Sequence, residues 1–461
     1  MAMNFGGTQV MVVGMARSGL AAVRLLAGRG ADVIAYDAKS AEQLPEVVEA
    51  LSSVPGVRLQ LGGDAIALLE QIQALFISPG VPIDSALVLR ARELGRPVLG
   101  EVELGYLFTQ CPIVAITGTN GKTTTTALTG QMFRRAGYNT HVVGNIGDPI
   151  CAHALDTRPE DMMVLEISSF QLESIDSFRP RVSVILNLSP DHLNRHHTME
   201  AYIDAKARVF ENQRGDDVLI LNWDDPQCRA LAPRARCRVA WFSRTEELEE
   251  GCFLKDGRIC WRWDGQLTAM GRPEEVRIPG LHNLENALAA SACAMYMGVS
   301  PQVVRHTLAA FEGVEHRLEF VIEHQGVRFF NDSKATNPDS SIKDVQAMNL
   351  PTILIAGGYD KGTGYSELAD AIVAGRVAGL VVMGATADQV ARAAAERGFT
   401  PIVHATSLED AVYKAYAMTH PGYNVLFSPA SASFDMFRDF EERGRVFKDI
   451  VARLVSETER R

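Results

Sequence analysis

The feature that most constrains the fold of this chain is a glycine-rich segment. It joins an apolar run to a helical pattern. Residues 118–124 read GTNGKTT; they follow the apolar run 113–116 and precede Leu128, Met132 and Phe133, which recur in a helical pattern. The order is therefore strand, glycine loop, helix. Backbone N–H groups point outward at such a turn, and the helix N-terminus adds a positive dipole end, so the segment predicts a site for a phosphate chain.

The residue types inside this loop indicate what each could do. We expect Lys122 to reach the terminal phosphates of a nucleotide and the Thr123 hydroxyl to contact Mg²⁺. The spacing is a variant, because the usual phosphate loop has its first glycine where this chain has Ile116. A glycine-rich turn without a ligand is the alternative, and a Gly-Lys-Thr sequence between a strand and a helix argues against it.

The bulk properties of the chain exclude several classes of protein. Its 461 residues are enough for roughly two to four domains. The formal net charge of −11 argues against a general nucleic-acid binder. The sequence has neither a signal-peptide pattern nor an apolar stretch of about 18 residues, so we expect no membrane span. Seven cysteines without a CxxC pair indicate reduced thiols in a cytoplasmic protein.

Alternating strand and helix patterns predict an α/β fold. Continuous apolar runs such as 352–356 and 424–427 are typical of strands that are buried on both faces of parallel sheets. Breaks near Gly100 and Gly313 divide the chain into three expected domains. These are a Rossmann-like N-terminal domain, a central P-loop-type parallel sheet and a Rossmann-like C-terminal domain, at 1–100, 101–313 and 314–461.

One stretch of the central domain has a different pattern. Residues 237–277 contain Trp241 and the pair Trp261 and Trp263, with Asp-Gly turns between the apolar segments. Short aromatic segments separated by such turns are typical of hairpins, so we expect a small antiparallel meander here.

The first βα turn offers a second nucleotide site. Residues 14–19, GMARSG, resemble a dinucleotide fingerprint in which Ala16 replaces the middle glycine, and Asp37 ends the next strand, where it could meet a ribose. We interpret this turn as a binding site for a nucleotide diphosphate. A Rossmann-like turn without a ligand is the alternative.

Two residues at the ends of central strands are candidate metal ligands. Glu166 ends the apolar strand 163–167, at the edge of the sheet where a metal-holding acid belongs. His192 follows the next strand and could coordinate a divalent ion or bind an anion. A solvated strand-end acid is the alternative for Glu166. We expect the nearby His196 and His197 to lie on the surface.

Lys206 lies on the apolar face of an expected helix, 199–210. Tyr202, Val209 and Phe210 share that face with it at helical spacing. Desolvation lowers the pKa of a lysine, and the neutral amine could react with CO₂ to form a carbamate, which is an anion. A salt bridge, or a side chain that extends to the surface, is the alternative.

Three polar loops follow the strands of the C-terminal domain. They are residues 331–338, the segment around Lys361 and the segment around Ser433. Because loops at the carboxyl ends of parallel strands form the binding crevice of such sheets, these hydroxyls and this lysine predict capture of a substrate that bears a carboxylate.

Together these motifs resemble the Mur ligases, a family of ATP-dependent amide ligases of peptidoglycan synthesis. The resemblance runs in order along essentially the whole chain, and the variant spacing of the phosphate loop is the family's own form. The motifs that carry it are 118–124, 166–171, 191–192 and 280–286. The loops 332–337 and 428–433 are similar to those of the members that add D-glutamate.

The resemblance implies a reaction and its participants. ATP and two Mg²⁺ ions would serve to join D-glutamate to UDP-N-acetylmuramoyl-L-alanine through an acyl phosphate. The partners implied are these small molecules, with no nucleic acid and no membrane. We expect a monomer.

The resemblance also assigns site residues by their positions in this sequence. The implied catalytic residues are Lys122, Glu166, His192 and Lys206. The implied metal ligands are Thr123, Glu166, His192 and Lys206 as its carbamate. ATP would contact Gly118, Thr119, Asn120, Gly121, Lys122, Thr123, Thr124, Asn283, Asn286, His316, Arg317 and Asp332. The UDP substrate would contact Ser18, Asp37, Ser78, Pro79, Gly80, Asn145 and Ser168. D-Glutamate would contact Thr336, Lys361, Ser433 and Phe440.

Three alternatives stay open at this point. A sister ligase would add L-alanine, a diamino acid or a dipeptide, or glutamate to folate, and the loop 332–337 argues against it. A nicotinamide dehydrogenase would use the turn 14–19 but would leave Lys122 and Glu166 without a purpose. The third alternative is a nucleotide-binding regulator without catalytic activity.

Overall fold

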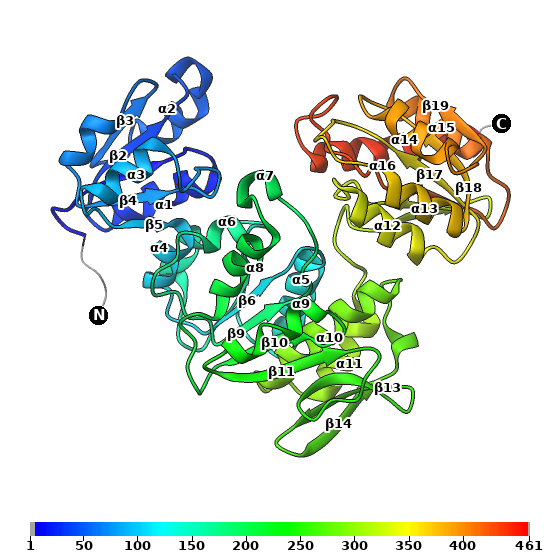
Figure 1. The fold of residues 1–461 in the computed structure, drawn as a ribbon, viewed down its shortest axis with the longest axis horizontal. Coiled ribbons are helices and arrows are strands. Elements are labelled where there is room, and N and C mark those ends of the chain that lie inside the picture. The colour runs from blue at the N-terminus through cyan, green and yellow to red at the C-terminus, as the bar shows by residue number, and fades with distance from the viewer. Residues whose placement is uncertain (1–4, 460–461) are drawn as a thin grey trace. The chain divides into compact units, whose positions relative to one another are not determined.

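The computed structural model describes residues 5–459 and divides into two compact units (Figure 1). The first unit runs up to Glu275 and continues over Glu285–Ala309. The second comprises Val276–Leu284 and the chain from Ala310 onward. Within residues 5–459, no helix is long and apolar enough to cross a membrane.

The first unit begins with a five-stranded parallel sheet. Its strand order is β3-β2-β1-β4-β5, as expected for a Rossmann-like domain. The strands are β1 Gln9–Val13, β2 Asp32–Asp37, β3 Val57–Leu61, β4 Ala74–Ile77 and β5 Val98–Gly100. The helices of this part are α1 Arg17–Gly28, α2 Pro45–Leu51, α3 Ala86–Glu93 and α4 Glu101–Phe108.

A nine-stranded sheet forms the rest of the first unit, in the order β14-β13-β12-β11-β10-β9-β6-β8-β7. Its strands are β6 Ile113–Thr117, β7 Thr140–Gly144, β8 Met162–Glu166, β9 Val182–Ile185, β10 Val218–Asn222, β11 Arg238–Ser243, β12 Gly251–Lys255, β13 Arg258–Trp263 and β14 Gln266–Gly271. The helices are α5 Lys122–Arg135, α6 Ser169–Leu172, α7 Leu193–His196, α8 Met199–Ala207, α9 Pro226–Arg229, α10 Leu281–Tyr296 and α11 Pro301–Ala310. The unit boundary falls inside α10.

The expected meander is shorter than the sequence pattern predicts. β11 pairs in parallel with β10, and β12 pairs in parallel with β11, so both extend the main sheet. Only the pairs β12–β13 and β13–β14 are antiparallel. The prediction was wrong over 237–250, because buried Phe242 and half-buried Trp241 pack on the parallel sheet instead of forming a hairpin.

The second unit contains a six-stranded sheet in the order β15-β16-β20-β17-β18-β19. The pair β15–β16 is antiparallel and the remaining pairs are parallel. The strands are β15 Glu319–His324, β16 Val327–Asn331, β17 Thr352–Ala356, β18 Val377–Val382, β19 Ile402–His404 and β20 Asn424–Phe427. The helices are α12 Pro338–Ala347, α13 Ser366–Ala374, α14 Ala387–Ala395, α15 Leu408–Ala417 and α16 Phe440–Glu459.

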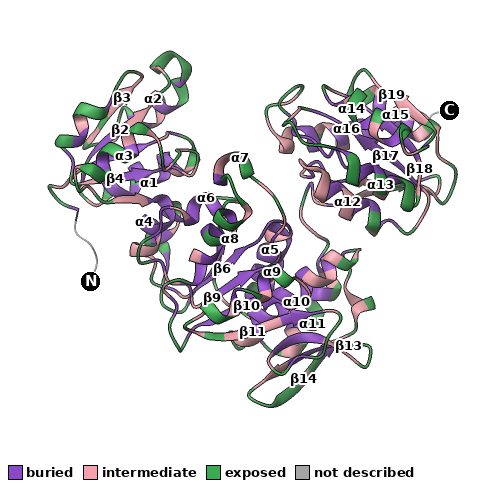
Figure 2. Cartoon of the chain, in the orientation of Figure 1, coloured by how far each residue is buried: buried purple, intermediate pink, exposed green. Residues whose placement is uncertain are grey.

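The central strands of each unit are the most buried segments (Figure 2). All residues of β6, β8, β10 and β17 are buried, which explains why they appear in the sequence as continuous apolar runs. Helices cover both faces of such strands, so polar groups at the strand ends are held in place by a rigid core.

Candidate active site

The glycine loop lies between β6 and α5, as the sequence predicts. Gly118 and Gly121 have φ angles of 146° and 84°, which side chains other than glycine rarely adopt. A Cβ atom on Gly118 would lie 2.9 Å from Cβ of Leu186, and one on Gly121 would collide with the Asn286 side chain. The loop therefore requires glycine at both positions for backbone and packing reasons.

Side chains of the loop and of the following strand end fix its shape. The Lys122 Nζ donates to the carbonyl oxygens of Gly118 at 3.0 Å and Thr119 at 2.8 Å. Asn187 follows β9 and pairs with the Asn120 backbone in both directions, at 2.8 and 3.1 Å. Sequence reasoning did not single out Asn187, although its place directly after a strand was a usable signal. Thr123 and Thr124 are buried at the start of α5.

Glu166 lies beside this loop, because β8 pairs in parallel with β6 and places Glu166 opposite Ile116. The carboxylate is buried; its Oε1 accepts a hydrogen bond from Asn145 Nδ2 at 2.8 Å, and its Oε2 accepts none. An unpaired buried carboxylate oxygen next to a phosphate-type loop fits a bound cation. Among residues 5–459, no three His, Cys, Asp or Glu side chains form a metal site by themselves. Substrate oxygens, water or the Thr123 hydroxyl would have to complete the coordination.

His192 occupies a left-handed backbone position at the start of α7, with φ of 54°. Its ring lies against Phe170, with 4.8 Å between ring centroids, and its side chain is half exposed. The Arg195 guanidinium lies over the Phe170 ring, 4.2 Å from its centroid. It also donates to the carbonyl oxygens of Pro79 and Val81 at 2.9 and 3.2 Å, which holds the α7 segment against the loop after β4.

The expectation that His196 lies on the surface was wrong. The imidazole is buried and lies 2.9 Å from Ser169 Oγ and 3.4 Å from Glu173 Oε1. Burial, followed by the charge of Arg195, lowers the pKa of His196 to about 4. His197 is exposed, as expected.

Lys206 is buried beneath the glycine loop, near the end of α8. The helix ends at Ala207 and a 3₁₀ turn covers Arg208–Phe210, so it is shorter than predicted, but Tyr202, Val209 and Phe210 are buried with Lys206 as expected. The Nζ atom donates to the carbonyl oxygen of Gly118 at 2.7 Å. Burial and then the charge of Lys122 lower the pKa of Lys206 well below its usual value, while Asp191 and Glu166 oppose that change.

A cavity of about 690 Å³ gathers most residues expected at the UDP substrate. It is lined by the first βα turn, the loop after β4 and the loop after β7. Of the expected residues, Ser18, Asp37, Ser78, Pro79, Gly80 and Asn145 line it. Ser168 does not; its hydroxyl caps α6, where it accepts a hydrogen bond from the backbone of Gln171, and Gln171 itself lines the cavity.

The expected adenosine residues belong to both units. Asn286 lies under the glycine loop in the first unit, where its Oδ1 accepts a hydrogen bond from Thr125 Oγ1 at 3.3 Å. Asn283, His316, Arg317 and Asp332 belong to the second unit. There His316 and Asp332 are buried, and Asp332 Oδ2 accepts a hydrogen bond from the Leu318 backbone at 2.9 Å. Asn283 donates to the Pro279 carbonyl oxygen at 2.7 Å.

The residues expected at D-glutamate follow strands of the second unit. Lys361 Nζ lies 3.4 Å from the carbonyl oxygen of Thr336, so two of the three predicted loops meet. Ser433 is buried in the third loop, and Phe440 begins α16.

A buried arginine that sequence reasoning missed joins these loops. Arg443 donates to the Ser333 hydroxyl and carbonyl oxygens at 3.0 and 2.7 Å. It also donates to the carbonyl oxygens of Ser431 and Ala432 at 3.1 and 2.9 Å. No sequence signal marked Arg443, because it lies among charged residues at the start of a helix.

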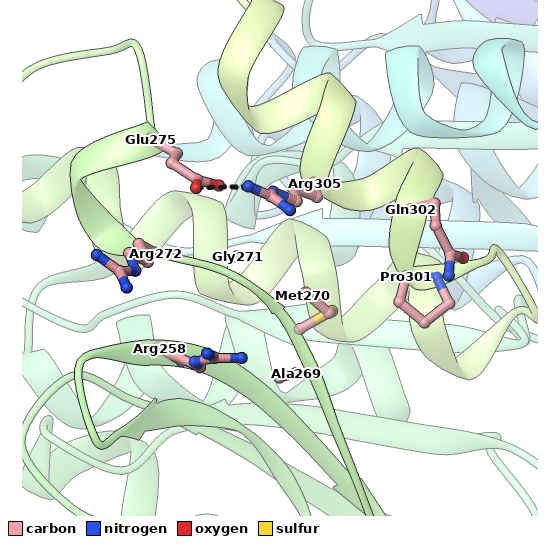
Figure 3. Close-up of a pocket in the computed structure, with 9 residues that line it drawn as sticks. All are labelled: Arg258, Ala269, Met270, Gly271, Arg272, Glu275, Pro301, Gln302 and Arg305. Atoms are coloured by element: carbon pink, nitrogen blue, oxygen red, sulfur yellow. Dashed lines mark hydrogen bonds and ion pairs between the residues drawn. The ribbon is translucent and has the colours of Figure 1, made fainter.

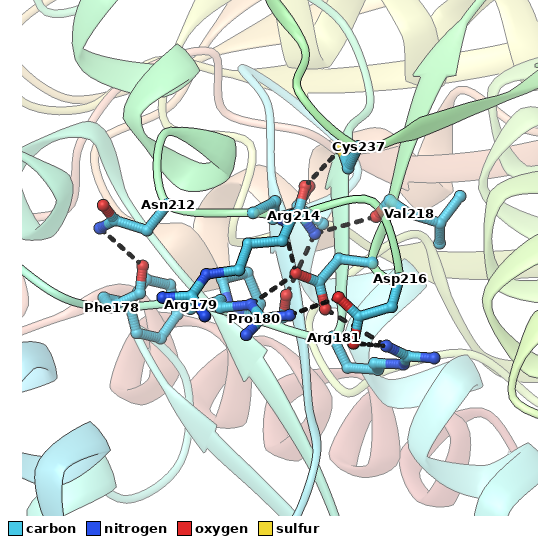
Figure 4. A network of polar contacts seen from close by, with 12 residues as sticks. Phe178, Arg179, Pro180, Arg181, Asn212, Arg214, Asp216, Val218 and Cys237 are labelled. Atoms are coloured by element: carbon cyan, nitrogen blue, oxygen red, sulfur yellow. Dashed lines mark hydrogen bonds and ion pairs between the residues drawn. The ribbon is translucent and has the colours of Figure 1, made fainter.

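Two polar clusters of the first unit contain none of the predicted site residues. In one, Arg305 forms a two-bond ion pair with Glu275, both bonds at 2.8 Å, beside Arg258 and Arg272 (Figure 3). In the other, Arg179 and Arg181 bind Asp216, and Asn212 donates to Phe178 at 3.1 Å (Figure 4). The second cluster lies at the amino ends of β9 and β10, where it ties the strand starts together.

Comparisons with known proteins agree along the whole chain. Three family models match: the N-terminal domain of MurD-like Mur ligases over residues 8–100, the Mur ligase middle domain over 116–294, and the Mur ligase glutamate ligase domain over 316–431. A UDP-N-acetylmuramoylalanine–D-glutamate ligase of Thermoanaerobacter sp. (strain X514) is 48% identical, over 98% of this chain and 100% of its own. The protein of the same name from Clostridioides difficile (strain 630) is 43% identical, also over 98% of this chain and 100% of its own.

Solved structures show the same fold. A pseudomurein peptide ligase from Methanothermus fervidus superposes with a TM-score of 0.60 at 17% identity, over 97% of this chain and all of its own. A UDP-N-acetylmuramate–alanine ligase from Thermotoga maritima gives 0.59 at 19% identity, over 98% of this chain and all of its own. Mur ligase family models match all three parts of the chain, and relatives of full length are more than 40% identical to it, so the chain belongs to the Mur ligase family.

Proposed function

We propose that this chain uses ATP to join the amine of D-glutamate to the L-alanine carboxyl group of UDP-N-acetylmuramoyl-L-alanine. One observation carries the proposal: relatives that are 48% identical over nearly the whole chain bear the name of that D-glutamate ligase. The variant glycine loop supports ATP as the source of energy, since its backbone and Lys122 can bind a phosphate chain.

In the proposed reaction, the L-alanine carboxylate attacks the γ-phosphate of ATP and an acyl phosphate and ADP form. The D-glutamate amine then attacks the acyl carbon, and phosphate leaves from the tetrahedral intermediate. The anionic reactants repel one another, so positive charge must lie between them. Lys122 supplies it from the loop once its ammonium leaves the Gly118 and Thr119 carbonyl oxygens for the phosphates.

The residues around Glu166 fit Mg²⁺, which when bound would neutralise phosphate charge and orient the reacting oxygens. We propose that Thr123 and Glu166 hold one ion and that His192 holds a second, supported by a carbamate on Lys206. The unpaired Oε2 of Glu166 and the burial of the Lys206 amine, which lowers its pKa, support this assignment. Positioning and charge stabilisation, not covalent chemistry on the protein, would account for most of the rate.

The remaining site residues are proposed from their positions. The cavity between the first βα turn and Asn145 would receive the UDP-linked substrate, with Asp37 and Ser78 in its wall. The domain division at residues 100 and 313, with nucleotide-sugar, ATP and amino-acid binding in that order, is part of the same proposal. So are the monomeric state and a cytoplasmic location.

An assay of phosphate release tests the proposal and its alternatives. With ATP, Mg²⁺ and UDP-N-acetylmuramoyl-L-alanine, release should depend on D-glutamate and should be absent with L-glutamate or L-alanine. Release with L-alanine or a diamino acid instead would favour a sister ligase. No release with any amino acid, together with tight nucleotide binding, would favour a regulator.

A further inference from the structure

His316 of the second unit is held in a strained and closely packed position. Its φ angle is 62°, which residues other than glycine rarely adopt. Its imidazole is almost completely buried, and a Cβ atom on Gly444 of α16 would collide with the ring. Such a backbone conformation persists only where the surrounding structure enforces it, so the contacts of the ring decide how it is placed.

Asn331, the last residue of β16, contacts this ring, and its other neighbours fix the orientation of its amide. Oδ1 accepts a hydrogen bond from the Ser333 backbone at 3.1 Å. Nδ2 donates to Glu319 Oε2 at 3.0 Å and to the carbonyl oxygen of Gly444 at 3.4 Å. The reverse orientation would place the amide oxygen against two acceptors and the NH₂ group against a backbone N–H. The NH₂ group therefore faces His316.

This orientation determines where the imidazole carries its proton. Asn331 Nδ2 lies 3.0 Å from Nδ1 of His316. Because the NH₂ group is a donor, Nδ1 must accept from it and carries no proton. A cationic ring has a proton on both nitrogens and would bring two donors together at this distance. His316 is thus neutral, with its proton on Nε2, and burial, which lowers the pKa of His316, favours the same state.

The Nε2–H group of His316 has no hydrogen-bond acceptor among residues 5–459. Glu315 Oε1 lies 3.7 Å from Nε2, too far for a hydrogen bond, and accepts from Lys448 Nζ at 2.5 Å. The ring therefore keeps one donor for a bound molecule. The adenine ring nitrogens and the ribose hydroxyl groups of a nucleotide are acceptors, so this donor fits the nucleotide contact that we propose for His316.

We propose that Asn331 is a positioning residue that holds His316 as the Nε2–H tautomer, so that the ring presents one donor to the adenosine part of ATP. The inference rests on the proposed assignment of His316 to ATP. Asn331 itself would touch no substrate, and its effect passes through the imidazole. Arg443, which binds the hydroxyl and carbonyl oxygens of Ser333, holds the residue whose N–H group orients Asn331.

NMR of the full chain, labelled with ¹⁵N-histidine, tests the tautomer without activity. Protonated and unprotonated ring nitrogens resonate far apart. The His316 signals are assigned by their absence from His316→Gln and by their shift in Glu319→Gln. At neutral pH, the original chain should show a protonated Nε2 and an unprotonated Nδ1. A proton on Nδ1, in a neutral or a cationic ring, overturns the proposal.

A double variant reverses the bond between Asn331 and the ring. In Asn331→Asp a carboxylate replaces the donor and can only accept, and Glu319→Gln in the same chain removes the like charge that this carboxylate would face. The double variant should carry a proton on Nδ1 of His316. Glu319→Gln alone is the matched control and should keep the proton on Nε2 only. The same protonation in both chains would overturn the role of Asn331.

Kinetics connect the tautomer with the nucleotide. In the double variant, KM for ATP should rise about tenfold relative to Glu319→Gln, because the donor toward the nucleotide is lost or altered. The values of kcat and of KM for D-glutamate should stay within about threefold. An unchanged KM for ATP, or an equal rise in both KM values, would overturn the proposal. Thermal unfolding of each variant shows whether it is folded.

Addition of ADP with Mg²⁺ to the labelled original chain needs neither catalysis nor a folded variant. The Nε2 signal of His316 should shift, while Nδ1 stays unprotonated. An Nε2 signal that does not change at saturating ADP overturns the proposed donor. If the original chain releases no phosphate with D-glutamate, the proposed function fails, but the tautomer and the ADP shift still decide the role of Asn331.

Discussion

Lys206 in the first unit and Arg443 in the second are both long basic side chains in almost complete burial, and their surroundings differ. Lys206 is 2% exposed and makes one short hydrogen bond, to the Gly118 carbonyl oxygen at 2.7 Å, and one long contact, to Thr117 Oγ1 at 3.5 Å. Arg443 is 1% exposed and makes four bonds to oxygen atoms, between 2.7 and 3.1 Å.

The difference shows that the effect of burial on the charge of a basic side chain depends on the acceptors and charges around it. Burial lowers the pKa of Arg443 only to about 10, so the guanidinium keeps its charge and its rigid fork joins two loops. The Lys206 ammonium has few acceptors and a second cation, Lys122, nearby, so the neutral amine is favoured. A neutral amine is a nucleophile, whereas a fully bonded guanidinium is a structural connector.

The largest expected effect is on activity at Lys206. Lys206→Ala should lower kcat on the order of 10³-fold, because the carbamate that we propose beside the phosphates would be lost. Short carboxylic acids such as acetate should restore part of the rate, measured as phosphate release. Lys206→Arg, which keeps a cation but cannot form the carbamate, should be as inactive and should not be rescued. Full activity of the Ala variant would refute this role.

The next effect is on stability at Arg443. Arg443→Lys should lower the free energy of unfolding by about 2–4 kcal/mol, because an ammonium cannot replace four directed bonds and buried carbonyl oxygens lose their donors. Urea unfolding, followed by a probe in the second unit, measures it. Arg438→Lys, at an arginine that is 81% exposed, is the control and should be nearly neutral. Equal stability of both variants would remove the distinction between the two buried cations.

The same two residues show what the sequence can predict. Lys206 was identifiable because a lysine on a helical apolar stripe violates the usual pattern, and its burial is confirmed. Arg443 violates no pattern: its neighbours in the sequence are charged, and its partners are carbonyl and hydroxyl oxygens more than ten residues away. Every residue type has a backbone carbonyl oxygen, so no sequence motif marks the ones that accept from Arg443.

The fold follows a similar rule. Parallel strands such as β6 and β17 were predictable, because burial on both faces leaves a continuous apolar run. The parallel pairing of β11 with β12 was not, since only residues 244–250 connect them and Asp-Gly turns nearby favoured hairpins. The carbamate on Lys206, the number of metal ions and the roles of the C-terminal loops stay predictions, as they depend on bound molecules.

His196 extends the comparison to a base that titrates under mild conditions. Its pKa is lowered to about 4 in the folded chain, so the unfolded chain binds the proton more tightly. Stability should therefore be fully present above about pH 6.5 and be lost as pH falls toward 4, by roughly 1 kcal/mol after allowance for screening. Thermal unfolding between pH 7 and pH 4 measures this loss. His196→Gln should flatten the profile in that window, and an unchanged profile would contradict the assignment.

The smallest effect is expected at an ion pair that is not buried. Arg305 and Glu275 form two bonds of 2.8 Å, as good in geometry as those of Arg443, but the Arg305 side chain is 57% exposed. Water competes for both charges, so Arg305→Ala should change the free energy of unfolding by less than about 1 kcal/mol, measured by urea unfolding beside Arg443→Lys. If Arg305→Ala lowers the free energy of unfolding as much as Arg443→Lys does, then bond geometry, rather than burial, sets the cost of removing a cation. The contrast between Lys206 and Arg443 would then need another cause.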